Sequence, residues 1–414
     1  MNFVVYSHYF VPEIGAPSAR IFDLAQQWLA SGHTVEVVTC FPNHPAGRLY
    51  PGYRSGGYMH EKIQGIDVHR NWTYITPNKG LFKKTIGHLS LYPSACLLIN
   101  RLVRKPDIAI GSSPTFFAAM AAQTAAWRHG APSIMEVRDL WPSVFVELGV
   151  LRNPYLIRIL ELWELWLYRH ATKVVTVTDA FRLNLIQRGV PVDKVFNVPN
   201  GADPEFWQPR EASAALREKL GLRDNFTILY IGAHGISQAL GRILESAAFL
   251  KSHPQIQFLF VGDGAEKEKL VQQAREQHLK NTHFLGPVEK ESVRDLYALA
   301  DLCLVPLRNT PIFDTFIPSK MFEMLAMARP IVASVRGEAA TILNRSGGAV
   351  VVEPEDSRGI AETILELSRC PGRLDTMGEC GRRFVIENYS RRALAKKYLE
   401  VIDAAIASHR RNRR

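Results

Sequence analysis

Short apolar runs alternate with stretches of helical periodicity along most of the chain. Residues 2–7 form an apolar run of strand length, and from Pro17 large apolar residues recur at spacings of three and four until Gly32, which predicts a helix. The pattern predicts further strands, most of them separated by helices, at 34–39, 66–71, 107–111, 133–137, 173–178 and 195–199. Alternation of this kind is typical of a parallel sheet with helices on both faces.

A polar turn, Asn200-Gly201-Ala202-Asp203-Pro204, interrupts this alternation of strands and helices, which then resumes. Strands are predicted at 226–231, 256–261, 283–285, 302–306, 331–334 and 349–352, and helices at 239–251, 265–277, 291–300 and 318–328. A chain of 414 residues is too long for one hydrophobic core. We therefore expect an α/β protein with two doubly wound, Rossmann-like domains at 1–200 and 201–389, joined by a linker at about 200–215. Residues 390–414 are expected to form a last helix with a basic tail.

Composition narrows the class of protein. The hydrophobic fraction of 47% and the charged fraction of 22% are those of a soluble globular protein. No apolar run reaches the length of a transmembrane helix, and the N-terminus enters a strand without a secretion signal. The five cysteines form no CxxC or Cys/His cluster, so neither zinc nor a disulfide framework is expected, and a reducing cytosol is the plain interpretation. The net charge of +10 indicates an anionic partner, and no nucleic-acid motif accompanies it.

The segment from Ile317 to Val332 carries the clearest chemistry. Pro318 suits the first turn of a helix, which brings Ser319, Lys320 and Glu323 to the helix N-terminus. Free N–H groups and a positive charge suit a diphosphate there, and a carboxylate one turn further suits the two hydroxyls of a ribose. This segment therefore predicts a nucleotide-diphosphate site, and an ordinary capped core helix is the alternative.

A second phosphate loop is predicted where a strand ends at Gly232-Ala233-His234-Gly235. The glycines Gly232 and Gly235 let backbone N–H groups approach a phosphate closely, although a plain tight turn has the same sequence. The turn Val261-Gly262-Asp263-Gly264 closes the next strand in the same way. We find no Asp-x-Asp pair on a strand-end loop, so no metal site is expected, and the diphosphate charge would be met by Lys320 and main-chain N–H groups.

Charged residues also follow a strand of the first domain, in Glu136-Val137-Arg138-Asp139-Leu140-Trp141-Pro142. At the carboxyl end of a parallel strand they would face a ligand site. Asp139 is our candidate to orient or deprotonate an acceptor hydroxyl, and Arg138 is our candidate to hold an acceptor phosphate. A structural ion pair is the alternative. The histidines of the candidate loops, His8, His44 and His234, are expected to be structural or solvated.

The chain resembles, over nearly its whole length, the retaining family 4 glycosyltransferases, which have two Rossmann-like domains facing across a cleft (the GT-B fold). The family has two glutamates separated by seven residues, of which the second matches Glu323 and the first is replaced by Thr315. The resemblance implies that Glu323 contacts ribose, that Thr315 lies beside the donor sugar, and that main-chain groups of Val288 hold the base. It also implies that the loop with Gly15 covers the donor and acceptor phosphates, that Arg20 contacts an anion, and that the last helix crosses back to the first domain.

Two motifs, Pro-Ser-Lys-x-x-Glu at 318–323 and Arg-Asp-x-Trp-Pro at 138–142, resemble a subgroup that acts on bacterial surface polysaccharides such as O-antigen, capsule and exopolysaccharide. The resemblance implies a metal-independent hexosyl- or N-acetylhexosaminyltransferase without a cofactor. It would use a UDP-sugar rather than a GDP-sugar, and the acceptor would be a polyprenyl-diphosphate-linked saccharide. Its place would be the cytoplasmic face of the inner membrane, as a peripheral protein of lipopolysaccharide or polysaccharide biosynthesis.

Two other functions stay open. A non-hydrolysing sugar-nucleotide 2-epimerase would bind a similar donor and need no acceptor. A non-catalytic scaffold that binds sugar nucleotide or membrane is the second, and Thr315 in place of the glutamate motivates it.

Two apolar segments of the first domain bear on membrane contact. The segment 78–105 has lysines before its apolar part and basic residues after it, which fits either an anionic membrane surface or a buried crossover helix with a basic rim. The segment 156–168, with Trp163 and Trp166, is expected to be core or domain interface rather than a membrane anchor.

Overall fold

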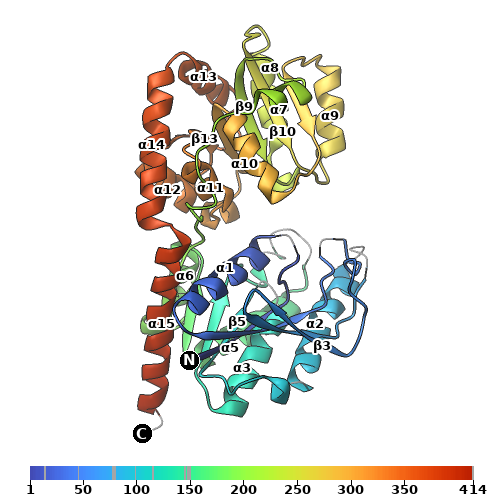
Figure 1. Cartoon of the computed structure of the whole chain (residues 1–414), viewed down its shortest axis with the longest axis vertical. Coiled ribbons are helices and arrows are strands. Elements are labelled where there is room, and N and C mark those ends of the chain that lie inside the picture. Colours follow the sequence, from blue (N-terminus) through green and yellow to red (C-terminus); the bar gives the residue numbers. More distant parts are fainter. Residues whose placement is uncertain are drawn as a thin grey trace. The chain divides into compact units, whose positions relative to one another are not determined.

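The structure is a computed structural model that describes residues 1–13, 15–44, 46–76, 81–97, 99–113, 116–143, 146 and 151–412. The chain divides into two compact units, one of Met1–Asn200 with Arg391–Arg414 and one of Gly201–Ser390. Figure 1 shows a sheet with helices packed on it in each unit.

The sheet of the first unit has, within the described ranges, the strand order β3-β4-β2-β1-β5-β6-β7-β8. Its strands are β1 (Asn2–Ser7), β2 (Thr34–Cys40), β3 (Tyr58–Ile63), β4 (Ile66–Asn71), β5 (Ile108–Ser112), β6 (Ser133–Val137), β7 (Lys173–Thr176) and β8 (Val195–Asn197). Neighbouring strands are parallel except β3 and β4, which are antiparallel. The carboxyl ends of the parallel strands therefore meet at one edge of the sheet, where ligands of such folds bind.

Helices cover both faces of this sheet. They are α1 (Ala16–Ala30), α2 (Leu81–Leu97), α3 (Phe116–His129), α5 (Pro154–His170), α6 (Asp179–Gln187) and α15 (Arg391–Asn412). Because side chains alternate along a strand, Phe3 and Val5 of β1 pack in the core with α1 and α15, whereas Val4 and Tyr6 pack in the core with α2 and α3. The last helix thus belongs to the first unit.

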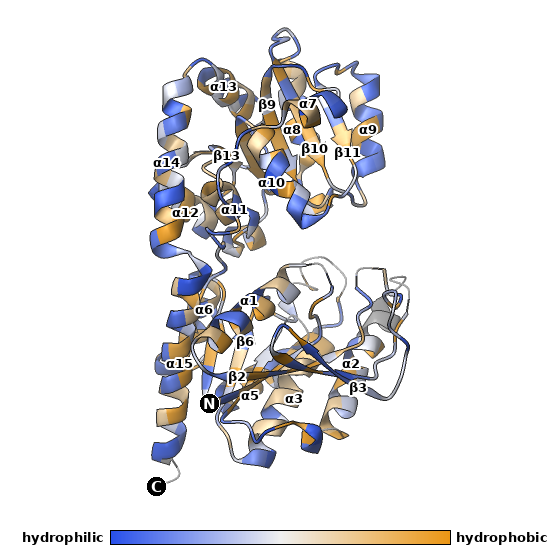
Figure 2. Cartoon of the chain, in the orientation of Figure 1, coloured by the Kyte–Doolittle hydropathy of each residue, from blue (hydrophilic) through white to orange (hydrophobic). Residues whose placement is uncertain are grey.

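The second unit, described without gaps, has a parallel sheet in the order β11-β10-β9-β12-β13-β14. The strands are β9 (Phe226–Ile231), β10 (Ile256–Val261), β11 (Thr282–Leu285), β12 (Leu302–Pro306), β13 (Ile331–Ser334) and β14 (Ala349–Val352). The helices are α7 (Ala214–Lys219), α8 (Leu240–Phe249), α9 (Lys267–Glu276), α10 (Lys290–Leu299), α11 (Lys320–Ala326), α12 (Gly337–Ser346), α13 (Ser357–Ser368) and α14 (Pro371–Asn388). Strands β9 and β10 are coloured hydrophobic in Figure 2, as expected for strands buried on both faces.

The predicted fold class, two doubly wound parallel-sheet units, is confirmed. The sequence pattern does not predict β3, whose residues are all partly buried or exposed, because this edge strand has no continuous apolar run. The helix predicted at 318–328 is shorter than expected, since α11 ends at Ala326 and Ala328 has a left-handed φ of 54°.

Burial in the two apolar segments of the first unit can be compared with expectation. In α5, Leu167 and Tyr168 are buried, but Leu156, Leu162 and Trp166 are exposed. The expectation of core for 156–168 is therefore wrong for the outer face of this helix, and the expectation of an interface stays a prediction. In α2, Leu91 is buried against α3 and Leu97 is exposed. Residues 77–80 lie outside the described ranges, and the membrane role of 78–105 stays a prediction.

Candidate functional site

A lysine at the start of α11 dominates the candidate donor site of the second unit. The Lys320 side chain is partly buried, and its Nζ donates to the Ile231 carbonyl over 3.2 Å and lies 3.9 Å from the ring centroid of Tyr230. Burial lowers the pKa of Lys320 to about 7, and the nearby Cys303 and Glu323 oppose that shift only partly. An ammonium held this way gains free energy from an incoming anion.

The loop after β9 brings backbone close to that ammonium. Gly232 has a φ of 144°, and a Cβ placed there would lie 3.4 Å from Lys320 Nζ. The Gly235 N–H, which we expected to be available to a phosphate, donates instead to Gln238 Oε1 over 3.2 Å. The Gly232 N–H likewise donates to the Val261 carbonyl over 2.9 Å. The prediction that these two N–H groups are available to a phosphate is therefore corrected, because both serve the loop itself, and Gly232 contributes only the open space that a residue without a side chain leaves beside Lys320 Nζ.

His234 locks this loop to the next strand-end turn. The residue is fully buried, its main-chain N–H donates to the Asp263 carbonyl over 2.8 Å, and its main-chain carbonyl accepts from the Glu266 N–H over 2.9 Å. A Cβ on Gly262, which has a φ of 133°, would lie 2.0 Å from the Gly232 carbonyl oxygen. Burial and the nearby Lys267 lower the pKa of His234 to about 4, so the imidazole is neutral at pH 7. His234 thus joins the two loops through its main chain, whereas its buried ring nitrogens Nδ1 and Nε2 have no hydrogen-bond partner among the described residues. The expectation that His234 is structural or solvated stays a prediction.

Helix α11 is too short to supply much charge by itself. It has seven residues, fewer than two turns, and Ser319 at its start has helical backbone angles without a side-chain cap bond. The predicted contribution of a helix dipole is thus small, and the positive charge comes mainly from Lys320.

Glu323 is oriented by a residue that the sequence analysis missed. The Tyr297 hydroxyl hydrogen-bonds this carboxylate, and the pKa of Tyr297 is raised well above its usual value by burial and then by Glu323. Tyr297 comes from α10 and is 1% exposed. The available signal was a tyrosine in the buried stretch Leu296–Leu299, since a buried phenol needs a partner, but the identity of that partner depends on the fold.

Thr315 and Val288, the two other residues predicted to bind the donor, differ in which polar groups they leave for a ligand. Thr315 lies in the 3-10 turn Pro311–Thr315, where its hydroxyl donates to the Ile312 carbonyl over 2.7 Å, so it offers a ligand only an acceptor oxygen. Val288 is partly buried between β11 and α10, and its main-chain N–H and C=O have no hydrogen bond within the described residues. A main-chain donor and acceptor of this kind can form hydrogen bonds with the edge of a nucleotide base.

In the first unit, Arg20 has a structural position. Its Nε donates to Glu136 Oε2 over 3.2 Å, Nη1 to the Pro199 carbonyl over 2.8 Å and Nη2 to the Val198 carbonyl over 2.8 Å. Ser112 Oγ donates to the second oxygen of the fully buried Glu136 over 2.9 Å. The expectation that Arg20 binds an acceptor anion is therefore corrected, because its guanidinium ties helix α1 to β6 and to the end of the unit.

Arg138 is the first residue after β6, and its guanidinium is less fully hydrogen-bonded than that of Arg20. Its side chain is 9% exposed, and no described residue accepts a hydrogen bond from Nη1. Burial first, and Arg20 second, lower the pKa of Arg138 to about 10, against the opposing effect of Glu136 and Asp139. A desolvated guanidinium without a bonded carboxylate is an anion-binding group.

Asp139 is partly buried beside it, and burial raises the pKa of Asp139 to about 6 although Arg138 lowers it. Such a carboxylate is ionised at pH 7 and close enough to neutrality to take up a proton. The Trp141 ring stacks on Phe116 at 5.0 Å, which anchors the segment after Asp139. Gly15 lies exposed before α1 with an extended φ of 161°, and its neighbour Ile14 lies outside the described residues.

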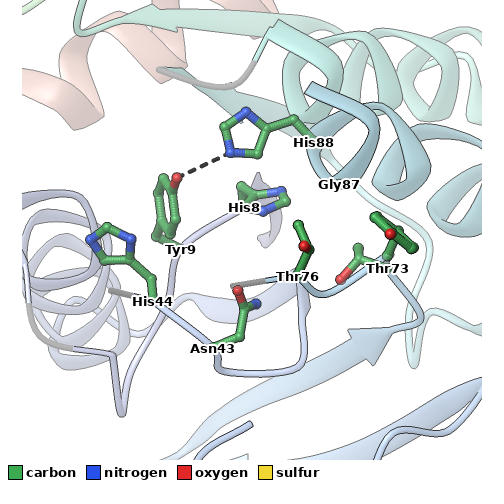
Figure 3. Close-up of a pocket in the computed structure, with 9 residues that line it drawn as sticks. His8, Tyr9, Asn43, His44, Thr73, Thr76, Gly87 and His88 are labelled. Carbon is green, nitrogen blue, oxygen red and sulfur yellow. Dashed lines mark hydrogen bonds between the residues drawn. The ribbon is translucent and has the colours of Figure 1, made fainter. Parts of the chain in front are cut away.

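The first unit also has a polar pocket at the carboxyl ends of β1, β2 and β4. It is lined by His8, Tyr9, Asn43, His44, Thr73, Tyr74, Thr76, Gly87 and His88 (Figure 3). The Tyr9 hydroxyl lies 3.2 Å from His88 Nε2, and Glu13 accepts the N–H groups of Asn43 and His44 over 2.7 and 2.9 Å. Hydroxyl, amide and imidazole groups without a lining carboxylate suit a polyhydroxylated ligand. No sequence signal joins Tyr9 and His88, because they are 79 residues apart.

Two further observations concern ions and membranes. Across the part of the chain that the structure describes, no group of three or more His, Cys, Asp or Glu residues could hold a metal ion. No helix found among those same residues is long and apolar enough to span a membrane.

Comparisons with known sequences follow the two units. Residues 15–201 match a Glycosyl transferase 4-like domain, and residues 225–370 match the Glycosyl transferases group 1 family. A putative colanic acid biosynthesis glycosyl transferase of Escherichia coli, WcaI, is 26% identical over 90% of this chain and 93% of its own length. The alpha-galactosylglucosyldiacylglycerol synthase of Streptococcus pneumoniae is 29% identical over 64% of this chain and 69% of its own length.

Solved structures agree on the fold. Sucrose-phosphate synthase of Thermosynechococcus elongatus has a TM-score of 0.75 at 17% identity over 98% of this chain and 99% of its own. Anabaena HepE, solved in complex with UDP-glucose, has a TM-score of 0.69 at 16% identity over 98% of this chain and 100% of its own. These structures have the GT-B fold, and the two domain matches together cover most of the chain. This protein is therefore a glycosyltransferase of the GT-B fold, built from a Glycosyl transferase 4-like domain and a Glycosyl transferases group 1 domain.

Proposed function

We propose that this protein moves a hexosyl or N-acetylhexosaminyl group from a UDP-sugar to a polyprenyl-diphosphate-linked saccharide, with retention at the anomeric carbon and without a metal ion. The reaction would serve bacterial envelope polysaccharide assembly at the cytoplasmic face of the inner membrane. The observation that carries the proposal is the partly buried Lys320 ammonium beside Gly232. Among the described residues this ammonium has one hydrogen-bond acceptor, the Ile231 carbonyl oxygen. The names of the relatives, which include colanic acid synthesis and a glycolipid synthase, support the pathway and the lipid acceptor.

The donor half of the mechanism rests on the second unit. Lys320 would neutralise charge on the diphosphate while the bond between the anomeric carbon and the leaving phosphate oxygen breaks. Glu323, oriented by Tyr297, would accept hydrogen bonds from both ribose hydroxyls, and the main chain of Val288 would hold uracil. Thr315 would accept one hydrogen bond from a donor-sugar hydroxyl where the family's glutamate accepts two. Gly15 would cover the phosphates.

The acceptor half rests on the first unit. Arg138 would bind an acceptor phosphate with its unpartnered Nη1, and the acceptor saccharide would occupy the pocket of His8, Tyr9 and His88. The acceptor hydroxyl oxygen would attack the anomeric carbon on the face that the diphosphate leaves. Its proton would pass to Asp139 or to the departing phosphate oxygen.

A binding screen tests the donor assignment first. Purified protein is unfolded thermally with UDP, GDP and their sugars, each with and without EDTA. A ligand at 100 times its dissociation constant stabilises by about 2.7 kcal/mol, so we expect a clear shift with UDP and UDP-sugars that EDTA does not abolish. A shift with no nucleotide contradicts the proposal. A shift that EDTA abolishes contradicts its metal independence.

Turnover then separates transfer from epimerisation. We expect UDP to be released from the matching UDP-sugar only when a polyprenyl-diphosphate-linked saccharide in detergent is present. Release of UDP, or conversion of the donor sugar, without acceptor would favour the 2-epimerase. Donor binding with no turnover over a broad acceptor panel would favour the scaffold.

A further inference from the structure

The outward face of α5 is apolar along its whole length. Tyr155, Ile159, Leu162 and Trp166 recur at spacings of four, three and four, which places them on one side of the helix. Their side chains are 81, 61, 52 and 41% exposed. The inward face instead holds a fully buried acid, Glu164, which pairs with Arg188 at 2.6 Å. A helix whose outer face met only water would carry polar residues at these outer positions.

A tryptophan of the neighbouring helix extends this face. Trp127 near the end of α3 is 56% exposed, and its ring meets Trp166 edge-on at 5.8 Å. We call Tyr155, Ile159, Leu162, Trp166 and Trp127 the apolar stripe. The four apolar positions from Tyr155 to Trp166 are eleven residue steps of helix apart from end to end, which is about 16 Å, so the stripe is a continuous patch rather than single exposed side chains.

Exposed arginines border the stripe. Arg158 is 70% exposed at its side chain, and Arg128 follows Trp127. Arg169 at the end of α5 is also exposed, although its Nε and Nη2 donate to the Gly189 and Arg188 carbonyls over 3.3 and 3.2 Å. One exposed-side acid, Glu161, lies among them, 3.8 Å from Arg158. The rim therefore has an excess of positive charge around an aliphatic and aromatic centre.

We infer that the apolar stripe is the surface by which this protein docks on an anionic lipid bilayer. Aliphatic side chains would enter the acyl boundary, the tyrosine and tryptophans would lie at headgroup level, and the arginines would contact lipid phosphates. The basic rim favours this occupant over a second copy of the chain, whose own rim would repel it. The inference rests on the proposed lipid-linked acceptor, and it assigns the membrane contact to α5 rather than to the segment 78–105.

Flotation of the full chain with vesicles tests the inference. Vesicles of phosphatidylglycerol and phosphatidylethanolamine in equal parts are compared with vesicles in which phosphatidylcholine replaces phosphatidylglycerol. The test variant is Ile159→Glu with Leu162→Glu. The matched control is Ile386→Glu, an isoleucine on α14 that is 43% exposed. Thermal unfolding and UDP binding establish that each variant is folded.

We expect wild type and control to float with anionic vesicles and the double variant to lose at least about tenfold in the ratio of bound to free protein. Sugar transfer to a detergent-solubilised acceptor should be unchanged in the double variant. Equal flotation of the double variant and the control overturns the inference. So does a wild-type dimer that the double variant disperses, since the stripe would then be a self-interface. Failure of wild type to float while it transfers sugar overturns the inference and leaves the proposed function standing.

Discussion

Replacing Lys320 with methionine should weaken donor binding and stabilise the free protein at the same time. Methionine has a similar length and no charge, so it fills the same space over the Tyr230 ring. The change removes an ammonium whose hydrogen-bond acceptor, among the described residues, is the Ile231 carbonyl. It also removes the cation that we assign to the diphosphate.

The size of both effects follows from the pKa of Lys320, which burial lowers from 10.5 to about 7. A shift of that size disfavours the charged form by about 5 kcal/mol, an upper limit because solvent reaches part of the side chain. We expect methionine to recover about 2 kcal/mol at pH 7, which raises the melting temperature by about 4 to 8 °C. A charge-assisted contact with a diphosphate contributes about 2 to 3 kcal/mol, so UDP should bind about 30- to 150-fold more weakly.

The pH dependence of stability has a definite sign. Between about pH 7 and 10.5 the unfolded lysine binds more protons than the native one, so the unfolding free energy of the wild type rises with pH. The advantage of methionine is therefore largest at pH 7 and below and shrinks across that window.

Calorimetric titration with UDP and thermal unfolding at several pH values measure both effects. The control is Lys269→Met, at a side chain that is 76% exposed, which should change neither quantity. A Lys320→Met protein that binds UDP as the wild type does would refute the diphosphate assignment. One that is destabilised at pH 7 would refute the account of burial.

Three other changes test the rest of the site. Glu323→Gln keeps a partner for the Tyr297 hydroxyl and should weaken UDP binding about tenfold but leave the affinity for 2′,3′-dideoxy-UDP unchanged; equal losses for both nucleotides would exclude a ribose contact. Asp139→Asn should lower kcat by about 100-fold, and it should abolish a rise of kcat with pH through about 6 that the wild type shows because burial raises the pKa of Asp139; a wild-type profile in the variant would remove Asp139 from the chemistry. Gly262→Ala should destabilise by about 3 kcal/mol or more in urea unfolding, because its Cβ would meet the Gly232 carbonyl oxygen at 2.0 Å; unchanged stability would show that the two loops can separate.

The sequence by itself determined the layered architecture of both units. Buried parallel strands such as β9 and β10 are continuous apolar runs, and α1 has its apolar residues at helical spacing, so local pattern and final structure agree. The segment 317–332 could also be interpreted locally, because Ser319, Lys320 and Glu323 lie within one turn of chain. Their spacing alone brings them together.

Only the tertiary structure decided which polar groups are used internally and which remain for a ligand. Arg20 and Arg138 look equivalent along the chain, yet Arg20 is bonded to Glu136 and two carbonyls, whereas Arg138 Nη1 has no acceptor among the described residues. Tyr297 meets Glu323, and Tyr9 meets His88, across long sequence separations. Such pairings depend on how distant elements pack, which no local spacing encodes.

The outer face of α5 also shows which features the sequence determines and which depend on the tertiary structure. Its apolar residues are visible in the sequence, and burial in the core was the simplest interpretation. Which side of a helix meets the sheet is decided by the packing of its neighbours, here α3 and β7, which take up Leu167 and Tyr168 and leave Ile159 and Leu162 outside. The hydrophobic pattern thus determined that α5 is a helix, and the fold determined that its apolar stripe is exposed, because burial depends on the whole chain and helix formation depends on a few turns of it.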